Sequence, residues 1–80
     1  MEETLLNKKF RLVETLGKVK VYTRVEEEVT IEVYLLSDDS ALLRAEISER
    51  YGDTHIARDL YTNVEDLELY ISDLLMEDEW

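Results

Sequence analysis

Side chains that could perform catalysis are scarce in this chain. His55 is the one histidine, and the sequence contains no cysteine and no glycine-rich loop of the kind that binds phosphate. Catalysis requires a nucleophile or an acid–base pair beside complementary groups, and no serine has the glycine spacing of a nucleophile elbow. We expect His55 to share a strand face with Ala57 and Asp59 as an ordinary surface or half-buried residue. The residue types therefore predict a protein that is not an enzyme and that uses no cofactor.

The carboxylates do not have the spacing of a metal site. No segment matches the calcium-loop pattern D-x-[DN]-x-[DN]-G. Asp38 and Asp39 form an isolated pair in a polar segment, and the acidic run 77–79 lies at the end of the chain, where fraying is common. The sequence therefore predicts no functional metal site.

The excess of carboxylates is the strongest chemical signal. The chain has 20 acidic and nine basic residues, for a net charge of −11. The charge is uneven, because residues 1–25 sum to +3 and residues 26–80 sum to −14. Such a field repels nucleic acid and anionic membranes and attracts basic proteins. It predicts a basic protein as partner, with no direct binding to nucleic acid or membrane, although acidity that serves solubility alone is an open alternative.

Length and composition define the frame that must position these acids. Eighty residues predict one domain over 1–80, and an apolar content of 45% is sufficient for a packed core. No apolar run approaches the roughly 18 residues of a membrane span, and the start of the chain lacks the positive region of a signal peptide. We therefore expect a cytoplasmic protein.

Residues 2–16 fit an amphipathic helix that ends at Gly17. The apolar residues of this segment fall within one stripe at 100° per residue: Leu5, Leu6, Phe10, Leu12, Val13 and Leu16. The alternative is a strand over 9–15 with a hairpin at Gly17, in which Leu12 and Val13 would face opposite sides of a sheet. The helix is the favoured interpretation.

Residues 18–25 and 29–36 alternate between apolar and polar side chains, which is typical of strands. A hairpin centred on Glu27 would match apolar with apolar residues on one face, with these partners: Val25 with Val29, Thr23 with Ile31, and Val21 with Val33. It would also place Tyr22 opposite Glu32. The valines of the first strand are thus predicted to face the core.

Two more strands and a helix complete the predicted domain. Residues 41–47 form a third strand and residues 54–61 a fourth, and Thr62 or Asn63 caps the final helix. The apolar stripe of that helix contains Val64, Leu67, Tyr70, Ile71, Leu74 and Leu75. The expected fold is α+β: a four-stranded antiparallel meander with an N-terminal and a C-terminal helix, in the order αββββα.

These elements would hold carboxylates at regular spacing. Around the first hairpin, alternation places Glu26, Glu28 and Glu32 on one face. The final helix places Asp66, Asp73 and Glu77 on one flank, at i, i+7 and i+11, and the surface extends to Asp38, Asp39 and Glu46. DNA presents one negative charge per roughly 1.7 Å of its axis. These nine residues are therefore candidate phosphate surrogates that bind a partner.

The size, the absence of cysteine, the acidity and the α+β pattern resemble those of small phage-encoded DNA-mimic proteins, in particular the type that inhibits the bacterial nucleoid protein HU. The resemblance covers the whole chain by character and rests on no diagnostic motif. It implies an inhibitor of a host DNA-binding protein, HU-like, whose DNA site the carboxylates would occupy. The basic segment 1–25 departs from a pure mimic, and we expect it to face away from the partner or to neutralise nearby acids.

Apolar residues outside the predicted core suggest a second class of function. Leu69 and Met76 lie off the core stripe of the final helix, and an exposed apolar stripe often marks a protein interface. The alternative function is therefore an interaction or structural module. A homodimer that buries Leu42, Leu69 and Met76 is also predicted, since isologous contacts are common.

Overall fold

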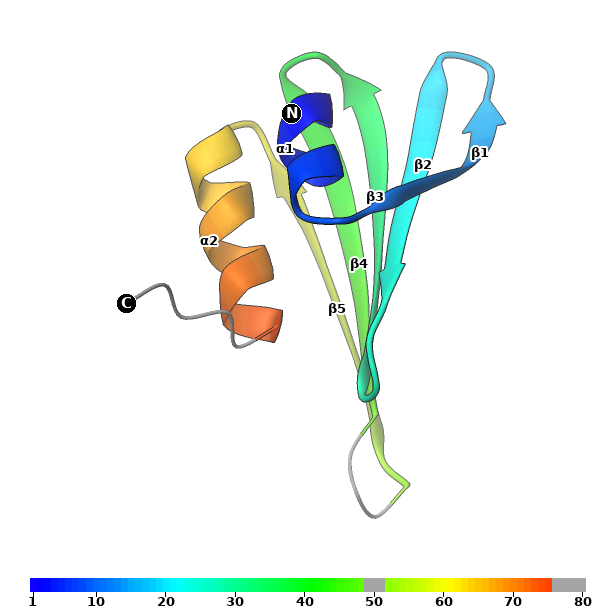
Figure 1. Cartoon of the computed structure of the whole chain (residues 1–80), viewed down its shortest axis with the longest axis vertical. Helices are drawn as coiled ribbons and strands as arrows, with labels where there is room; N and C mark the ends of the chain where they lie inside the picture. Colours follow the sequence, from blue (N-terminus) through cyan, green and yellow to red (C-terminus); the bar gives the residue numbers. More distant parts are fainter. Residues whose placement is uncertain (49–51, 76–80) are drawn as a thin grey trace.

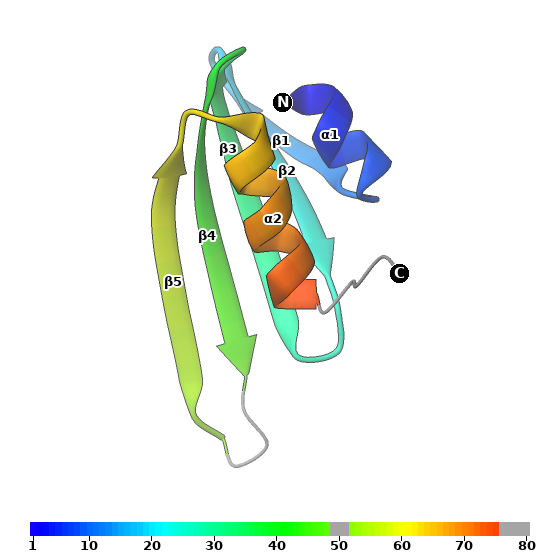
Figure 2. The same ribbon diagram turned by 90° about the vertical axis from the view of Figure 1, so that its left-hand side faces the viewer.

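The computed structural model describes residues 1–48 and 52–75. Its elements, in chain order, are α1 (Glu2–Asn7), β1 (Arg11–Leu16), β2 (Val19–Val25), β3 (Val29–Ser37), β4 (Ser40–Ser48), β5 (Thr54–Tyr61) and α2 (Val64–Leu75). The strands form one antiparallel sheet in the order β1-β2-β3-β4-β5 (Figure 1). Both helices lie on the same face of this sheet (Figure 2). The α+β class is confirmed, but the prediction of four strands is wrong, because the sheet has five.

The additional strand comes from residues 2–16, which were predicted to form one helix. Lys9 has a positive φ of 64°. Its N–H donates to the carbonyl of Leu6 at 3.1 Å, and the N–H of Phe10 donates to the carbonyl of Leu5 at 3.0 Å. These two bonds form a Schellman ending, and the burial of Leu5 and Phe10 supplies the apolar contact that accompanies it. The helix therefore stops early, and the chain enters the sheet.

Gly17 belongs to a hairpin and not to a helix end. Leu16 pairs with Val19, so the loop between β1 and β2 has two residues. Gly17, the first of them, has a φ of 64°, as a type II′ turn requires. The pairing register shifts between Leu12 and Glu14, and this bulge absorbs the residue that broke the alternation. The alternative of a strand followed by a hairpin at Gly17 is confirmed.

The pairing of β2 with β3 differs by one residue from the predicted pairing. Tyr22 lies opposite Val33, where the hairpin centred on Glu27 would have placed Val21. A slip of one residue sends every side chain of a strand to the other face. Tyr22 is 2% exposed and belongs to the main core, whereas Val21 is buried outside that core. Tyr22, and not the valines, is the core residue of β2.

The rest of the core follows the sequence pattern. Inward residues of β3 and β4 pair with one another, and Leu67 and Ile71 of α2 cover them. The buried core cluster comprises Leu5, Phe10, Tyr22, Ile31, Val33, Leu35, Ala41, Leu43, Ala45, Leu67 and Ile71. Asn63 caps α2, because its side-chain oxygen accepts the N–H of Glu65 at 2.8 Å. Of the two predicted caps, Asn63 is the residue used.

Candidate protein-interaction surfaces

The outward face of α2 carries a cluster of carboxylates. Glu65, Asp66, Glu68 and Asp73 are all exposed and surround Leu69, which is 65% exposed; we call these five residues the acidic helix face. Within the described residues, none of the four carboxylates takes part in an ion pair or a side-chain hydrogen bond. The packing of Leu67 and Ile71 in the core fixes this orientation of the helix.

The carboxylates of the acidic helix face can be compared with phosphates. From Glu65 to Asp73 the helix rises about 12 Å, because each residue adds about 1.5 Å. The four carboxylates are therefore about 4 Å apart along the axis on average, compared with 3.4 Å along a single DNA strand. Their separations are uneven, because three of them lie within four residues and Asp73 follows five residues later. The acidic helix face therefore has a mean charge density slightly below that of one DNA strand, without its regular spacing.

A second acidic surface lies beside the C-terminal end of α2. A hollow of about 730 Å³ opens between the β2–β3 hairpin and the helix. We call it the acidic hollow; its rim carries Glu26, Glu27, Glu28 and Asp73, and its apolar wall contains Val29, Ile47, Leu74 and Leu75. Asp73 belongs to both acidic surfaces, so the two are continuous.

Arg24 reduces the charge of the hollow on one side. Its Nε lies 2.7 Å from Glu26 Oε1, and its NH1 donates to the carbonyl of Lys8 at 2.8 Å. Glu27 and Glu28 have no ion pair with any residue that the structure describes. Those two carboxylates are therefore more available to a cationic partner than Glu26 is.

The nine predicted carboxylates do not form a single row. Glu26, Glu28 and Asp73 meet at the acidic hollow, and Asp66 lies on the acidic helix face. Glu32 and Glu46 lie on the other side of the sheet, 3.5 and 3.6 Å from NH1 of Arg44.

Two predicted carboxylates lie at the opposite end of the domain, and one cannot be placed. Asp38 and Asp39 occupy the β3–β4 turn, far from the β2–β3 hairpin (Figure 1). Glu77 lies outside the described residues. Sequence reasoning missed Glu27, Glu65 and Glu68; the last two flank Leu69 on a helical wheel, which was sufficient to find them.

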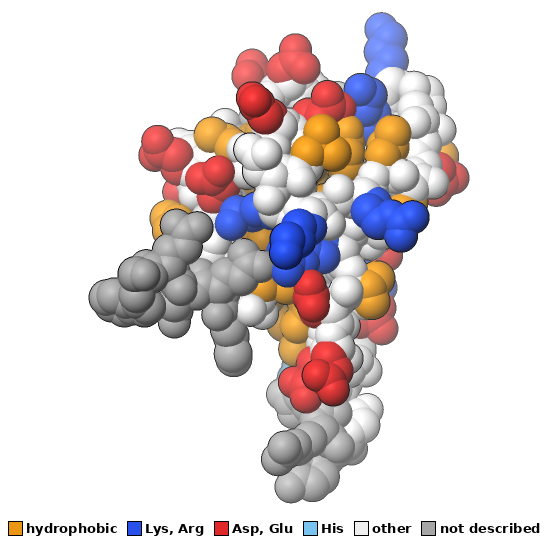
Figure 3. Space-filling model, in the orientation of Figure 1, with side chains coloured by type: hydrophobic (Ala, Val, Ile, Leu, Met, Phe, Trp, Pro, Cys, Tyr) orange, Lys and Arg blue, Asp and Glu red, His pale blue; other side chains and the backbone are white. Residues whose placement is uncertain are grey.

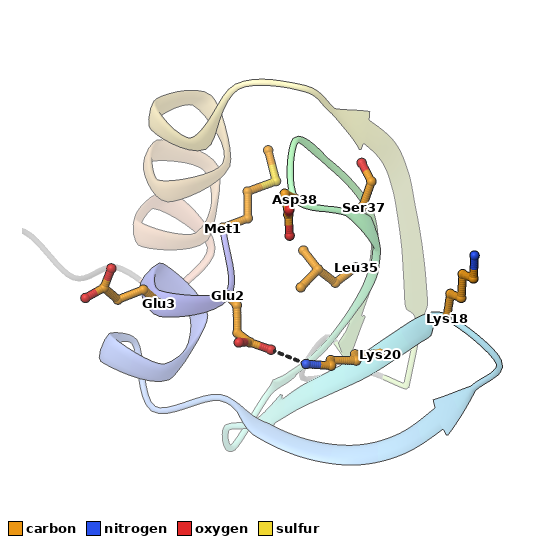
Figure 4. Close-up of a pocket in the computed structure, with 8 residues that line it drawn as sticks. All are labelled: Met1, Glu2, Glu3, Lys18, Lys20, Leu35, Ser37 and Asp38. Carbon is orange, nitrogen blue, oxygen red and sulfur yellow. Dashed lines mark hydrogen bonds and ion pairs between the residues drawn. The ribbon is translucent and has the colours of Figure 1, made fainter.

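The basic N-terminal segment pairs with a nearby acid, in line with the second of the two expectations for it. Lys20 Nζ lies 2.9 Å from Glu2 Oε2 (Figure 4), and the Tyr22 hydroxyl donates to the same oxygen. These hydrogen bonds lower the pKa of Glu2, and burial, followed by the bond to Glu2, raises the pKa of Tyr22 to about 12. Lys20 and Tyr22 thus fasten α1 to β2, which is the physical reason for the observed register.

Basic side chains are visible between the acidic regions. Figure 3 shows Lys and Arg in a band across the middle of one side of the molecule, with Asp and Glu above and below. Lys8 contacts α2, because its Nζ donates to Ser72 Oγ at 2.9 Å. On this side of the molecule, basic side chains therefore lie between groups of acidic side chains.

The sheet face opposite the helices is a further exposed surface, which we call the open face. Within the described residues no helix covers it (Figure 2). Its upper part is an apolar row across four strands, in which Val21 pairs with Tyr34, Tyr34 with Leu42, and Leu42 with Leu60. Leu42 is 38% exposed and Leu60 54%. Val21 is buried, so Leu42 and Leu60 are the most exposed apolar residues of this row. Exposed apolar groups that adjoin in this way often mark an interface.

The three residues predicted to form a dimer interface are not brought together. Leu42 lies on the open face, and Leu69 lies on the acidic helix face, on the opposite side of the sheet. Met76 lies outside the described residues. A single patch that contains both leucines is therefore excluded by the fold.

Two further observations concern metal binding and membrane-spanning helices. In the described part of the chain, no three His, Asp or Glu side chains are arranged to hold a metal ion. Neither described helix combines the length and the apolar character needed to cross a bilayer. His55 lies on β5 on the side of Ala57 and Asp59, as predicted.

Comparison with protein-family models, with curated proteins and with solved structures gives no match.

Proposed function

We propose that this chain inhibits a basic DNA-binding protein by occupying its DNA site. The acidic helix face and the acidic hollow would contact the lysines and arginines that otherwise hold phosphates. The observation that carries the proposal is the group of four carboxylates on α2, which pair with no base among the described residues and lie about 4 Å apart along the helix axis on average. The nucleoid protein HU is the specific partner that the resemblance to phage-encoded DNA mimics implies.

The physical argument has two parts. Long-range attraction to a cationic surface accelerates association, and it is strongest where acids are not already paired with bases. The carboxylates on α2 and on the hairpin are held by folded elements, so little conformational entropy is lost when a partner orders them. The apolar wall of the hollow, with Leu74 and Leu75, adds a contact that DNA itself lacks.

A charge-matched pair of variants tests which carboxylates bind. Asp66→Asn with Asp73→Asn removes two charges from α2, and Glu32→Gln with Glu46→Gln removes two from the open face. Both variants have the same net charge, so a general effect of charge would change them equally. Titration against HU by calorimetry at about 0.1 M salt should show about tenfold weaker binding for the first variant, a loss of about 1.4 kcal/mol. The second should remain within about twofold of the parent, and equal losses would contradict the assignment.

Salt and DNA provide the second test. Binding should weaken steeply as salt rises, because screening shortens the range of charge interactions to about 3 Å at 1 M. A DNA duplex should compete with the chain for HU. A stable ternary complex with DNA, or binding unchanged at about 0.5 M salt, would exclude occupation of the DNA site.

The alternative function, an interaction module with an apolar anchor, is supported by the exposure of Leu69. It predicts the opposite pattern, in which Leu69→Ser abolishes binding of a partner while the Asp66 and Asp73 variant has little effect. In that case the acidity would serve solubility alone.

A further inference from the structure

The open face differs in charge from the rest of the molecule. The strand register places three acids and three bases on it: Arg11, Glu14, Glu32, Arg44, Glu46 and Arg58. Its formal charge is therefore zero, on a chain with a net charge of −11. Any association between two copies meets repulsion between like charges, and this repulsion is smallest at a neutral surface.

The charged and the apolar residues of this face lie mostly in different rows of the sheet. One charged row crosses all five strands, in which Arg11 pairs with Thr23, Thr23 with Glu32, Glu32 with Arg44, and Arg44 with Arg58. The apolar row of Val21, Tyr34, Leu42 and Leu60 crosses the upper half and ends at Glu14 of β1. Glu32 and Glu46 already pair with Arg44 in the same chain, and a two-fold axis along the strands places the apolar rows of two copies against each other.

Because this face is neutral and carries exposed apolar side chains, we infer that the open face binds the open face of a second copy of this chain. The homodimer has two sheets packed face to face, about 10 Å apart as in other sheet pairs. The helices of the two copies lie on the outside, so that both acidic helix faces remain accessible on opposite sides of the dimer. A basic partner, by contrast, is attracted to those acidic surfaces and not to the neutral face.

The size of the face sets the expected strength of the dimer. Five strands about 4.8 Å apart, with six to nine residues each, cover roughly 20 by 25 Å. This projected area of about 500 Å² is smaller than the roughly 800 Å² per partner of a standard stable complex. We therefore expect a reversible dimer that forms at micromolar concentration.

Sedimentation equilibrium of the parent chain between about 5 and 300 µM, in low and high salt, tests the inference. Raising the salt from about 0.05 to 0.5 M should tighten the dimer at least threefold, because screening removes the repulsion between two acidic chains. This response is opposite in sign to that of the proposed partner binding, so the two proposals can fail independently. The mass of one chain at all concentrations and salts would overturn the inference.

Matched variants locate the interface. Leu60→Lys, on the open face, should shift the dimer to monomer, whereas Leu69→Lys, at a somewhat more exposed position on α2, should leave it unchanged. Circular dichroism establishes that each variant is folded. A dimer that survives Leu60→Lys but is lost in Leu69→Lys would overturn the inference.

The absence of cysteine from the sequence allows a second measurement that does not depend on weakening the contact. Single-cysteine variants Leu42→Cys and Leu69→Cys are treated with a short bifunctional thiol reagent at a concentration where the parent is dimeric. Crosslinked dimer is expected from Leu42→Cys, and little from Leu69→Cys. Efficient crosslinking through position 69 alone would place the contact on the helices and overturn the inference.

Discussion

Replacement of Lys9 by glycine should stabilise the domain. Lys9 adopts the left-handed conformation, with a φ of 64°, which costs a residue with a side chain about 1 to 2 kcal/mol. Glycine avoids this cost but loses about 0.5 to 1 kcal/mol through the greater freedom of the unfolded chain. The net gain is about 0.5 to 1 kcal/mol. For a domain of this size it corresponds to a rise of about 2 to 8 °C in the unfolding midpoint.

The sign of this effect distinguishes the structure from the helix predicted over 2–16. In the middle of a continuous helix, glycine would destabilise the protein by about 1 kcal/mol relative to alanine. Thermal unfolding of Lys9→Gly, followed by circular dichroism, is therefore compared with that of Lys9→Ala. Alanine removes the same charge but keeps the Cβ that makes the left-handed conformation costly. A midpoint for Lys9→Gly below that of Lys9→Ala would refute the Schellman ending and the early entry into β1.

Three further changes test other parts of the fold. Asn63→Ala should cost about 1 kcal/mol through loss of the helix cap, measured by urea unfolding, whereas Thr62→Ala should change stability by less than half of that. Ile71→Ala should cost about 2 to 5 kcal/mol, because the side chain is fully buried, whereas Leu69→Ala should cost less than about 0.5 kcal/mol. Because burial raises the pKa of Tyr22 to about 12 from the ordinary value near 10, its contribution to stability is complete below pH 10 and is lost as pH rises through 12. Unfolding midpoints measured across this range should therefore fall less steeply in Tyr22→Phe, and an unchanged slope would show that Tyr22 does not contribute.

Elements with a regular pattern and a clear boundary could be predicted from the sequence. The inward residues of β3 and β4 alternate without interruption, and the stripe that contains Leu67 and Ile71 has helical spacing with a capping residue before it. At these positions core packing and local propensity favour the same structure, so the sequence pattern is sufficient to predict it.

The N-terminal third could not be predicted from periodicity. Its apolar residues satisfy a helical stripe, but the observed fold uses them in a short helix and a bulged strand. Helix α1 ends just before Lys9, which has a left-handed conformation that glycine usually adopts, and the bulge interrupts the alternation of apolar and polar residues in β1. Neither feature leaves a signal in residue types.

The register of β2 depended on contacts from outside the hairpin. Valines alternate on one face and Lys20, Tyr22 and Arg24 on the other, and the valine face was the reasonable choice for a core. In the fold, α1 supplies Glu2 for two of these side chains, and Lys8, which directly follows α1, supplies its carbonyl for the third. These contacts from outside the hairpin hold the face of β2 that carries Lys20, Tyr22 and Arg24 towards the helices. The same orientation explains why Glu32 lies away from Glu26 and Glu28, and why the candidate carboxylates could not be grouped from spacing alone.

The strand order also has a consequence for the speed of folding. Every strand pairs with its neighbour in the chain, so each pair of strands can form without a contribution from a distant part of the sequence. Sheets built from local pairings have low contact order, and such proteins fold faster than sheets with crossed connections. Each hairpin can close within microseconds once both of its strands are available. During synthesis the sheet can therefore grow one strand at a time behind the ribosome, and α2, which follows β5 in the chain, then covers strands that are already paired.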